Sequence, residues 1–348
     1  MCMILAVPPA SPGGVPALNK TSNGSEFGTA FLANCHHLRY NQLTSYFPGG
    51  KGRAESLVEA GPACLGRAGI GIMITTGAGI LTHPVQPLRV VQLSDFHLFA
   101  DTDGKLLGLN TQFSLEAVLD RVRREQPDMD LILATGDLSQ DGSYESYQRL
   151  AKTLSGFRAP IYWLEGNHDK PAPMLRALRG QDNRVSPCVA DIGNWTLVLL
   201  DSTIPGEVPG DLFDEDLKFL DDALRDAAGE HLLVCLHHHP VPMGSEWLDT
   251  QLVGSAERFF EVIDAHPRVR GILWGHVHQE YDDTRNGVRL LAVPSTCVQF
   301  KPGSADFAVD DTSPGYRWLD LHADGGIDTA VSRVEGIHFE VDMSVKGY

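Results

Sequence analysis

From residue 88 onward, short apolar runs alternate with segments in which apolar residues recur at helical spacing. The apolar runs are bounded by turn residues and predict strands at 88–94, 129–135, 160–165, 195–201, 231–236 and 269–274. The helical segments predict helices at 111–125, 143–154, 214–228 and 255–265. Asp214 is expected to cap the third of these helices, because aspartate is a favoured N-cap residue.

After residue 280 the pattern becomes one of hairpins. Residues 281–285 and 288–293 are strand-like and flank Asn286-Gly287, a turn pair typical of two-residue hairpin loops. Further short strands are predicted at 316–322 and 327–331. Strands that alternate with helices and then give way to hairpins predict an α/β (α+β) fold, a four-layer αββα sandwich of two mixed β-sheets flanked by helices.

Residues 1–86 differ from the rest, because they are rich in Gly, Pro, Ser and Asn and show little sustained periodicity. We expect a low-order N-terminal extension at 1–86, a folded domain at 87–335 and a C-terminal tail at 336–348. The first strand begins soon after Met73, so we hypothesise that translation starts there and that the preceding residues are an over-extended start. The alternative is a genuine disordered tail, and mass spectrometry of the native N-terminus separates the two.

The composition indicates which kinds of binding partner the chain is suited to. Of the 348 residues, 43% are hydrophobic and 21% are charged, as in an ordinary globular protein, and the net charge is −17. An acidic chain is poorly suited to bind the nucleic-acid backbone. The apolar stretch 68–81 is too short and too rich in glycine for a membrane span. None of the six cysteines forms a C-x-x-C pair, so we expect reduced thiols and a cytoplasmic location.

Five predicted strands end in Asp, Asn or His. The five blocks are Asp95-Phe-His97, Gly136-Asp137, Gly166-Asn-His-Asp169, His237-His-His239 and Gly275-His-Val-His278. Each block alone is weak evidence, and Asn167, for example, also fits a cap for a helix entering at Pro171. Parallel strands place their carboxyl ends at one edge of a sheet, so the blocks together predict one metal-rich edge.

These side chains offer oxygen and nitrogen ligands and no thiolate, which suits Mn, Fe, Co or Zn. One ion needs three or four protein ligands, whereas at least seven candidates are present, so two ions fit better than one. Two ions ~3.5–4 Å apart form the clamp used in phosphoester chemistry, and a carboxylate can bridge them. Asp169 could orient His168 or bond the backbone, and the sequence leaves both roles open.

Taken together, the blocks D-F-H, G-D-L-S-Q-D, G-N-H-D, L-H-H-H-P and G-H-V-H resemble those of the calcineurin-like metallophosphoesterases, over about 88–293. Within that family the chain is most similar to the class III cyclic-nucleotide phosphodiesterases. The stretches that carry this closer resemblance are 97–101, 108–111, 134–141, 157–160 and 237–244. Residues before Met73 have no counterpart in the family pattern.

The resemblance implies a set of site residues. One ion would be held by Asp95, His97, Asp137 and His278, and the other by Asp137, Asn167, His237 and His276. Asp137 would bridge the two ions, and His238 remains an alternative to His237. His168 would be the catalytic residue beside the leaving oxygen, and with Asn167 it would contact the substrate. Fe and Mn are the expected metals, and Zn and Co also suit these ligands.

The resemblance further implies hydrolysis of 3',5'-cyclic AMP to AMP by a hydroxide that bridges the two ions. The same ion pair would serve a broader phosphodiesterase that acts on glycerophosphodiesters or 2',3'-cyclic nucleotides, and a phosphomonoesterase is less favoured. A non-catalytic scaffold of this fold is disfavoured, because His168 and every candidate ligand are present. The expected partner is a small phosphodiester, with no nucleic acid and no membrane, and a homodimer is left open.

Overall fold

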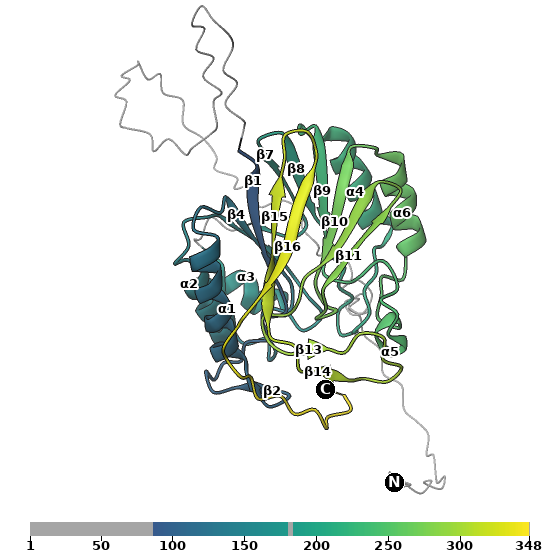
Figure 1. The fold of residues 1–348 in the computed structure, drawn as a ribbon. Coiled ribbons are helices and arrows are strands. Elements are labelled where there is room, and N and C mark those ends of the chain that lie inside the picture. Colours follow the sequence, from purple (N-terminus) through teal and green to yellow (C-terminus); the bar gives the residue numbers. More distant parts are fainter. Residues whose placement is uncertain (1–85, 180–183, 348) are drawn as a thin grey trace, which may run out of the picture. The chain divides into compact units, whose positions relative to one another are not determined.

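The computed structural model describes residues 86–179 and 184–347 (Figure 1). All of these residues belong to one compact unit. The N-terminal extension and the start at Met73 concern residues outside the described part, apart from residue 86, and the predicted domain boundaries stay predictions. Among the described residues, no helix combines the length and the apolar character needed to span a membrane.

The first sheet has six strands in the order β16-β15-β1-β4-β5-β6. Its strands are β1 (Leu88–Leu93), β4 (Leu131–Thr135), β5 (Ile161–Leu164), β6 (Arg184–Val185), β15 (Gly315–Leu321) and β16 (Ile327–Arg333). Strands β1, β4, β5 and β6 are parallel, whereas β15 and β16 join as antiparallel neighbours. The sheet is therefore mixed, as the sequence predicts.

The second sheet also has six strands, in the order β11-β12-β10-β9-β8-β7. Its strands are β7 (Cys188–Ile192), β8 (Trp195–Leu199), β9 (His231–Cys235), β10 (Val269–Trp274), β11 (Tyr281–Arg285) and β12 (Val288–Ala292). The four central strands are parallel and the two outer ones are antiparallel. The hairpin turn lies at Asn286, whose φ of 52° is the left-handed conformation that this turn requires.

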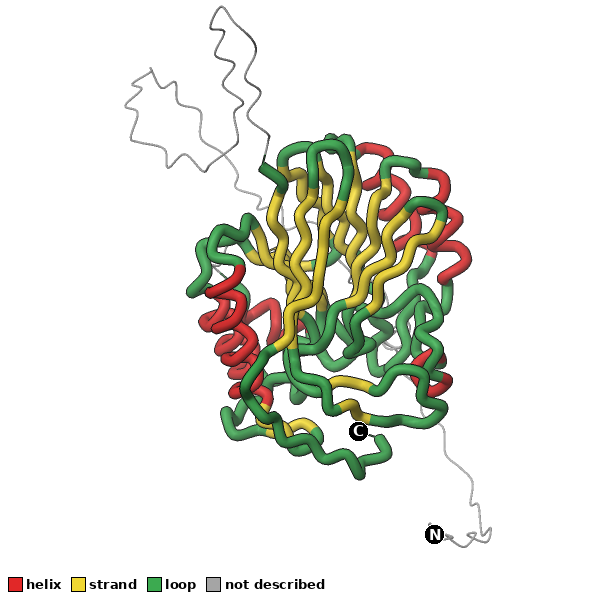
Figure 2. Tube along the Cα trace, viewed as in Figure 1, coloured by secondary structure: helices red, strands yellow, loops and turns green. Residues whose placement is uncertain are grey.

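The two sheets and the helices outside them form four layers (Figure 2). Three clusters of apolar side chains lie between these layers. One fills the space between the two sheets and includes Leu133 and Leu233. The second lies under α1 (Thr111–Glu125), α2 (Tyr144–Leu154) and α3 (Pro171–Ala177), and the third under α4 (Asp214–Asp226), α5 (Glu246–Asp249) and α6 (Ala256–Ala265). Because both faces of each sheet are covered, the central strands are mostly apolar, with a few polar residues such as Gln92 and Thr196. The predicted αββα sandwich is confirmed.

The predicted strands and helices that carry the motifs are present, with ends that differ by a few residues. The predicted cap at Asp214 is wrong: the helix begins there, Phe213 is the N-cap residue, and Asp216 accepts a hydrogen bond from its N–H at 3.0 Å. Seven short elements are not among those that the sequence pattern predicts. They are β2 (Lys105–Leu106), β3 (Leu109–Asn110), β6, β7, α5, β13 (Gln299–Phe300) and β14 (Val309–Asp310).

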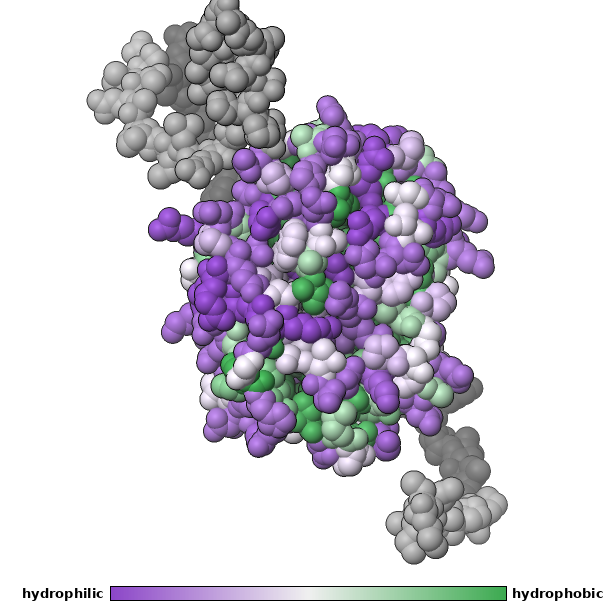
Figure 3. Space-filling view, viewed as in Figure 1, coloured by the Kyte–Doolittle hydropathy of each residue, from purple (hydrophilic) through white to green (hydrophobic). Residues whose placement is uncertain are grey.

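The surface of the described residues is mainly hydrophilic. Hydrophilic side chains cover most of the face shown in Figure 3, in keeping with the net charge of −17. Apolar side chains gather at the lower end of that view, where Figure 1 places β2 and the C-terminal residues. There the tail meets the β2–β3 hairpin, and the N–H of Asp342 donates to the carbonyl of Leu107 at 2.7 Å.

Candidate active site

A first group of side chains converges where β1, β4 and β10 end. Nε2 of His97 lies 3.1 Å from Nε2 of His278 and 3.5 Å from Oδ2 of Asp137. Nε2 of His278 lies 3.5 Å from Oδ1 of Asp95. All four side chains are buried. The structure thus brings together the four residues expected to hold one ion.

A second group shares Asp137 with the first. Nε2 of His237 lies 3.5 Å from Oδ1 of Asp137 and 3.3 Å from Oδ1 of Asn167. The rings of His237 and His276 are 5.1 Å apart between centroids. Asp137 therefore turns one carboxylate oxygen toward each group, which is the arrangement that a bridging ligand needs.

The geometry favours His237 over His238 as the ligand. Nδ1 of His238 lies 2.9 Å from Oγ of Ser202, and its Nε2 lies 3.0 Å from the carbonyl oxygen of Val208. Both ring nitrogens of His238 are thus engaged by the surrounding protein. His237 keeps Nε2 directed at Asp137.

Three of the histidines are held by an oxygen on the side of the ring away from the cluster. Nδ1 lies 2.6 Å from Oε1 of Gln140 in His97, 2.8 Å from the Thr135 carbonyl in His237, and 2.8 Å from the Val298 carbonyl in His278. These oxygens only accept, so each ring in its neutral form carries its proton on Nδ1 and directs the lone pair of Nε2 inward.

The positions of the ring protons show whether these residues are suited to bind a metal ion. The lone pairs of His97 and His278 face each other at 3.1 Å, a contact that is repulsive unless a cation lies between them. Among the described residues, four groups of three side chains each have their potential ligand atoms within 4.8 Å of one another, and one of these groups is Asp95, Asp137 and His237. The donor set and its tautomers therefore fit bound metal ions.

The charges also suit metal binding. Burial raises the pKa of the Asp137 carboxyl, but His237 and His168 outweigh this effect, and the pKa lies well below its usual value. Burial lowers the pKa of His97 to about 3. At neutral pH Asp137 is thus ionised and the neighbouring His97 is neutral, which are the forms of these two groups that bind metals.

The backbone of the site is strained. Five candidate ligands have φ in the left-handed region, namely Asp95 (56°), His97 (46°), Asp137 (49°), His276 (65°) and His278 (48°). In the described part of the chain, the other non-glycine residues with positive φ are Leu107 and Asn286. Such backbone strain is concentrated at functional sites, where surrounding structure holds it in place.

The glycines of the motifs allow this close packing. A Cβ added to Gly136 would overlap Nδ1 of His237, and one added to Gly166 would overlap Oδ1 of Asp137. A Cβ on Gly275 would overlap Oγ of Ser94. The pairs Gly-Asp, Gly-Asn and Gly-His therefore bring the backbone of one strand end against the ligands of another.

The Gly166–Asp169 block resolves two open alternatives. Helix α3 has Lys170 as its N-cap residue, so Asn167 does not cap it. Asp169 accepts hydrogen bonds from the N–H groups of Gly166, Leu138 and Ser139 at 2.9, 3.1 and 3.1 Å. It therefore bonds the backbone and ties this block to the loop that carries Asp137.

His168 lies beside the cluster. Its N–H donates to Oδ1 of Asp137 at 3.0 Å, and its ring centroid lies 4.9 Å from that of His97. Asn167 and His168 are partly exposed, whereas the other candidate ligands are buried. A substrate can therefore reach the cluster past these two side chains.

Sequence reasoning missed two glutamines whose side chains contact the expected ligand histidines. Gln140 contacts His97, and Oε1 of Gln251 lies 3.1 Å from Nε2 of His276. Gln140 lies inside the G-D-L-S-Q-D block, so its position next to the ligands was a usable signal. Gln251 lies in a loop after α5, and nothing in its sequence neighbourhood marks it.

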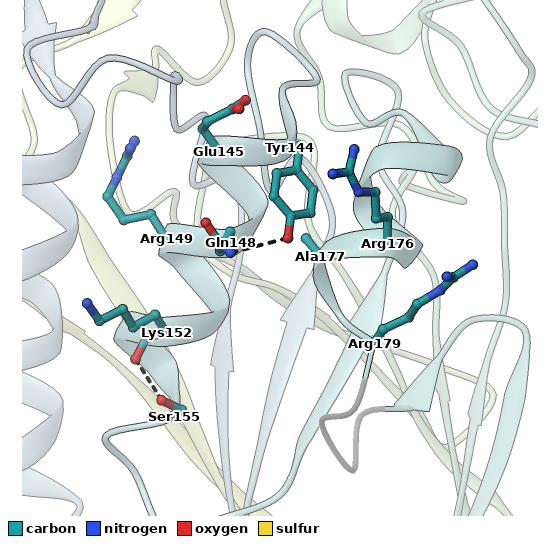
Figure 4. Close-up of a pocket in the computed structure, with 9 residues that line it drawn as sticks. All are labelled: Tyr144, Glu145, Gln148, Arg149, Lys152, Ser155, Arg176, Ala177 and Arg179. Atoms are coloured by element: carbon teal, nitrogen blue, oxygen red, sulfur yellow. Dashed lines mark hydrogen bonds between the residues drawn. The ribbon is translucent and has the colours of Figure 1, made fainter.

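A separate depression lies between α2 and α3 (Figure 4). Arg149 and Lys152 point away from Arg176 and Arg179 in this view. None of the candidate ligands lines the depression. Because its cations diverge, it does not form a focused anion site.

Comparison with known proteins places this geometry in context. Residues 88–280 match the family model of the calcineurin-like phosphoesterases. The 3',5'-cyclic adenosine monophosphate phosphodiesterase CpdA of Pseudomonas aeruginosa is 52% identical over 259 residues, which cover 74% of this chain and 94% of that protein. The protein of the same name from Escherichia coli is 46% identical over 263 residues, covering 75% and 95%.

The solved structures show the same architecture. A dimetal phosphatase from Danio rerio superimposes with a TM-score of 0.50 at 17% identity, covering 72% of this chain and 100% of that one. At this identity the likeness concerns the fold alone.

Proposed function

The chain belongs to the calcineurin-like phosphoesterase family, and we propose that its site hydrolyses 3',5'-cyclic AMP to AMP. The proposal is carried by the match to two phosphodiesterases named for this substrate, at 52% and 46% identity. The span that matches the family model, residues 88–280, contains His168 and all seven candidate ligands.

We assign the ligands as two sets that share one carboxylate. The first set is Asp95, His97, Asp137 and His278, and the second is Asp137, Asn167, His237 and His276. Two ions bound there would neutralise phosphate charge and provide hydroxide near neutral pH. The oxygen and nitrogen donors suit Mn, Fe, Co and Zn, and the family resemblance favours Fe or Mn among them.

Cys297 does not add a thiolate to these sets, although its sulfur lies near His97 and His278. Burial raises the pKa of this thiol to about 12, and its Sγ donates to the carbonyl oxygen of Asp95 at 3.4 Å. The site therefore keeps the hard donors that its sequence motifs specify.

His168 and Asn167 are the residues that act on the substrate. Water adds across the bond between phosphorus and O3', and the departing oxygen takes up a proton. His168, at the accessible side of the cluster, is placed to donate that proton, which contributes about 10²–10⁴-fold to such reactions. The Asn167 carboxamide can donate to a phosphoryl oxygen while its Oδ1 faces His237.

A panel of substrates tests the proposal. The full chain, loaded with Mn²⁺ or Fe²⁺, is compared on 3',5'-cyclic AMP, 2',3'-cyclic AMP, bis-p-nitrophenyl phosphate and p-nitrophenyl phosphate by kcat/KM. Asp137→Ala serves as the blank, because it removes the shared ligand. A clear preference for 3',5'-cyclic AMP is expected, and a poor rate on it beside a high rate on the 2',3' isomer would contradict the substrate assignment.

The same panel addresses the other functions. A broader phosphodiesterase would turn over the bis-ester and glycerophosphodiesters as fast as the cyclic nucleotide. A scaffold would turn over none of them. The proposal extends to a cytoplasmic location, where free thiols such as those of Cys188, Cys235 and Cys297 stay reduced. A homodimer stays a prediction, which light scattering of the purified chain would test.

A further inference from the structure

Two glutamine side chains contact histidines of the site, one in each ligand set. Oε1 of Gln140 lies 2.6 Å from Nδ1 of His97. Oε1 of Gln251 lies 3.1 Å from Nε2 of His276. The remaining two histidines, His237 and His278, are held by backbone carbonyls instead. Each ion site therefore has one histidine fixed by the backbone and one fixed by a glutamine.

The contact at His276 also selects the ring nitrogen. A carboxamide oxygen accepts a hydrogen bond, so Nε2 of His276 carries the proton. Nδ1 is left as the nitrogen with a free lone pair. His97 has the opposite tautomer, because its Nδ1 faces Gln140. The two glutamines thus set opposite tautomers at the two sites.

Both glutamines are themselves held by the backbone. The N–H of Gln140 donates to the carbonyl of Leu98 at 2.8 Å, next to the metal-ligand loop. The N–H of Gln251 donates to the carbonyl of Leu248 at 2.9 Å, and two residues later Val253 bonds the carbonyl of His239 at 3.0 Å. The backbone of each glutamine is therefore held in place, and its carboxamide oxygen contacts one histidine.

We infer that Gln140 and Gln251 are positioning residues, and that each sets the affinity of one ion site through the histidine it contacts. The inference rests on the proposed function only for the presence of two ions. Outer partners of this kind typically change metal affinity by about 10–100-fold when removed.

The experiment measures ion binding with no substrate present. Mn²⁺ is titrated into the metal-free full chain, and the concentration of free Mn²⁺ is measured by EPR. The two stepwise dissociation constants are obtained from this titration. Gln140→Met and Gln251→Met remove the accepting oxygen at nearly constant volume, whereas Gln140→Glu and Gln251→Glu keep it. Gln148→Met is the control, because Gln148 is an exposed glutamine of α2 that donates to the hydroxyl of Tyr144, as Figure 4 shows.

Each methionine variant is expected to weaken one binding step by about 10–100-fold and to leave the other step within about threefold. The glutamate variants and Gln148→Met are expected to bind both ions nearly as the unchanged chain does. Loss of both steps in a single methionine variant, no loss in either, or a glutamate variant as weak as its methionine counterpart would overturn the inference.

Double-mutant cycles assign each glutamine to its site. In a His276→Ala background, Gln251→Met should have no further effect, whereas Gln140→Met should still weaken the remaining ion. A His97→Ala background should give the reverse. If the chain binds two ions in this pattern but leaves cyclic AMP intact, the proposed function fails and the positioning roles stand.

Discussion

Nε2 of His237 lies 3.5 Å from Oδ1 of Asp137, and both side chains are buried. Burial alone lowers the pKa of His237, but the Asp137 carboxylate more than reverses this and raises it to about 9 when no ion is bound. At pH 7.5 the ring is therefore protonated. An ion that binds at His237 has to displace that proton.

Ion binding at the second site should accordingly release a proton below about pH 9. Because the pKa of His237 is higher in the ion-free fold than its ordinary value of 6.5, protonation of His237 stabilises that fold, and this stabilisation is complete below about pH 6.5. The stabilisation is lost as the pH rises through the folded-state pKa of about 9. Metal affinity should thus rise by up to about tenfold per pH unit between these values. Calorimetric titration in two buffers of different ionisation enthalpy measures the proton. Asp137→Asn should abolish the release, and equal heats in both buffers for the unchanged chain would contradict the prediction.

Gly136→Ala should disturb the second ion site more than it disturbs the fold. Its φ of 101° is unfavourable for alanine, and the added Cβ would overlap Nδ1 of His237. Gly193→Ala is the matched control, because Gly193 has φ of 62° and no atom within 4 Å of the added Cβ. Both variants should lose about 1 kcal/mol or more of stability through the backbone.

Only Gly136→Ala should also weaken ion binding, by at least about tenfold, because it shifts a ligand directly. Urea unfolding of the metal-free chains and Mn²⁺ titration separate the two effects. Equal ion affinities in the two variants would show that the clearance at Gly136 is unimportant.

Much of the site was readable from the sequence because its ligands lie at strand ends in short local blocks. Asp95 and His97, like His276 and His278, are two residues apart in the chain, so each pair can be recognised without knowledge of distant contacts. The parallel order of β1, β4, β9 and β10 then brings the blocks to neighbouring edges. A local signal and a simple topology were sufficient.

The remaining features depend on tertiary packing. Whether His237 or His238 faces Asp137 is decided by Ser202 and Val208, which engage the ring of His238. The contact between Gln251 and His276 joins two loops that no pattern relates. The same limit applies to the fold, where Phe213 replaces Asp214 as the N-cap residue because Asp216 bonds back to it.

Replacement of Arg317 should destabilise the sandwich itself. Its side chain is 1% exposed, lies on β15 of the first sheet, and donates to the carbonyls of Ala292 and Tyr281 in the second at 3.0 and 2.9 Å. Arg317→Met removes these charged hydrogen bonds between the two sheets, and a loss of about 2–5 kcal/mol in the free energy of unfolding is expected.

Urea unfolding measures this loss, and Arg285→Met is the control. Arg285 makes a more exposed ion pair with Asp264 at 2.6 Å, a kind of contact worth about 0–1 kcal/mol. A similar loss in both variants would mean that the bonds between the sheets contribute no more than a surface pair.

His168→Ala should lower kcat by about 10²–10⁴-fold on 3',5'-cyclic AMP and leave metal content nearly unchanged. The side chain lies at the accessible side of the cluster, and its assigned role is to give a proton to a poor leaving group, the ribose O3'. Metal analysis by mass spectrometry checks that both ions remain. His322→Ala is the control, because His322 lies outside the cluster and pairs with Asp328 at 2.9 Å.

A comparison of two substrates with different leaving groups tests the role of His168 as a proton donor more directly. p-Nitrophenolate departs without a proton, so His168→Ala should lose much less rate on bis-p-nitrophenyl phosphate than on the cyclic nucleotide. If the two substrates lose rate equally while the ions stay bound, His168 stabilises charge common to both reactions, and the proton belongs to another group. If the variant loses an ion, His168 is a ligand, and its contact with Asp137 has a structural purpose.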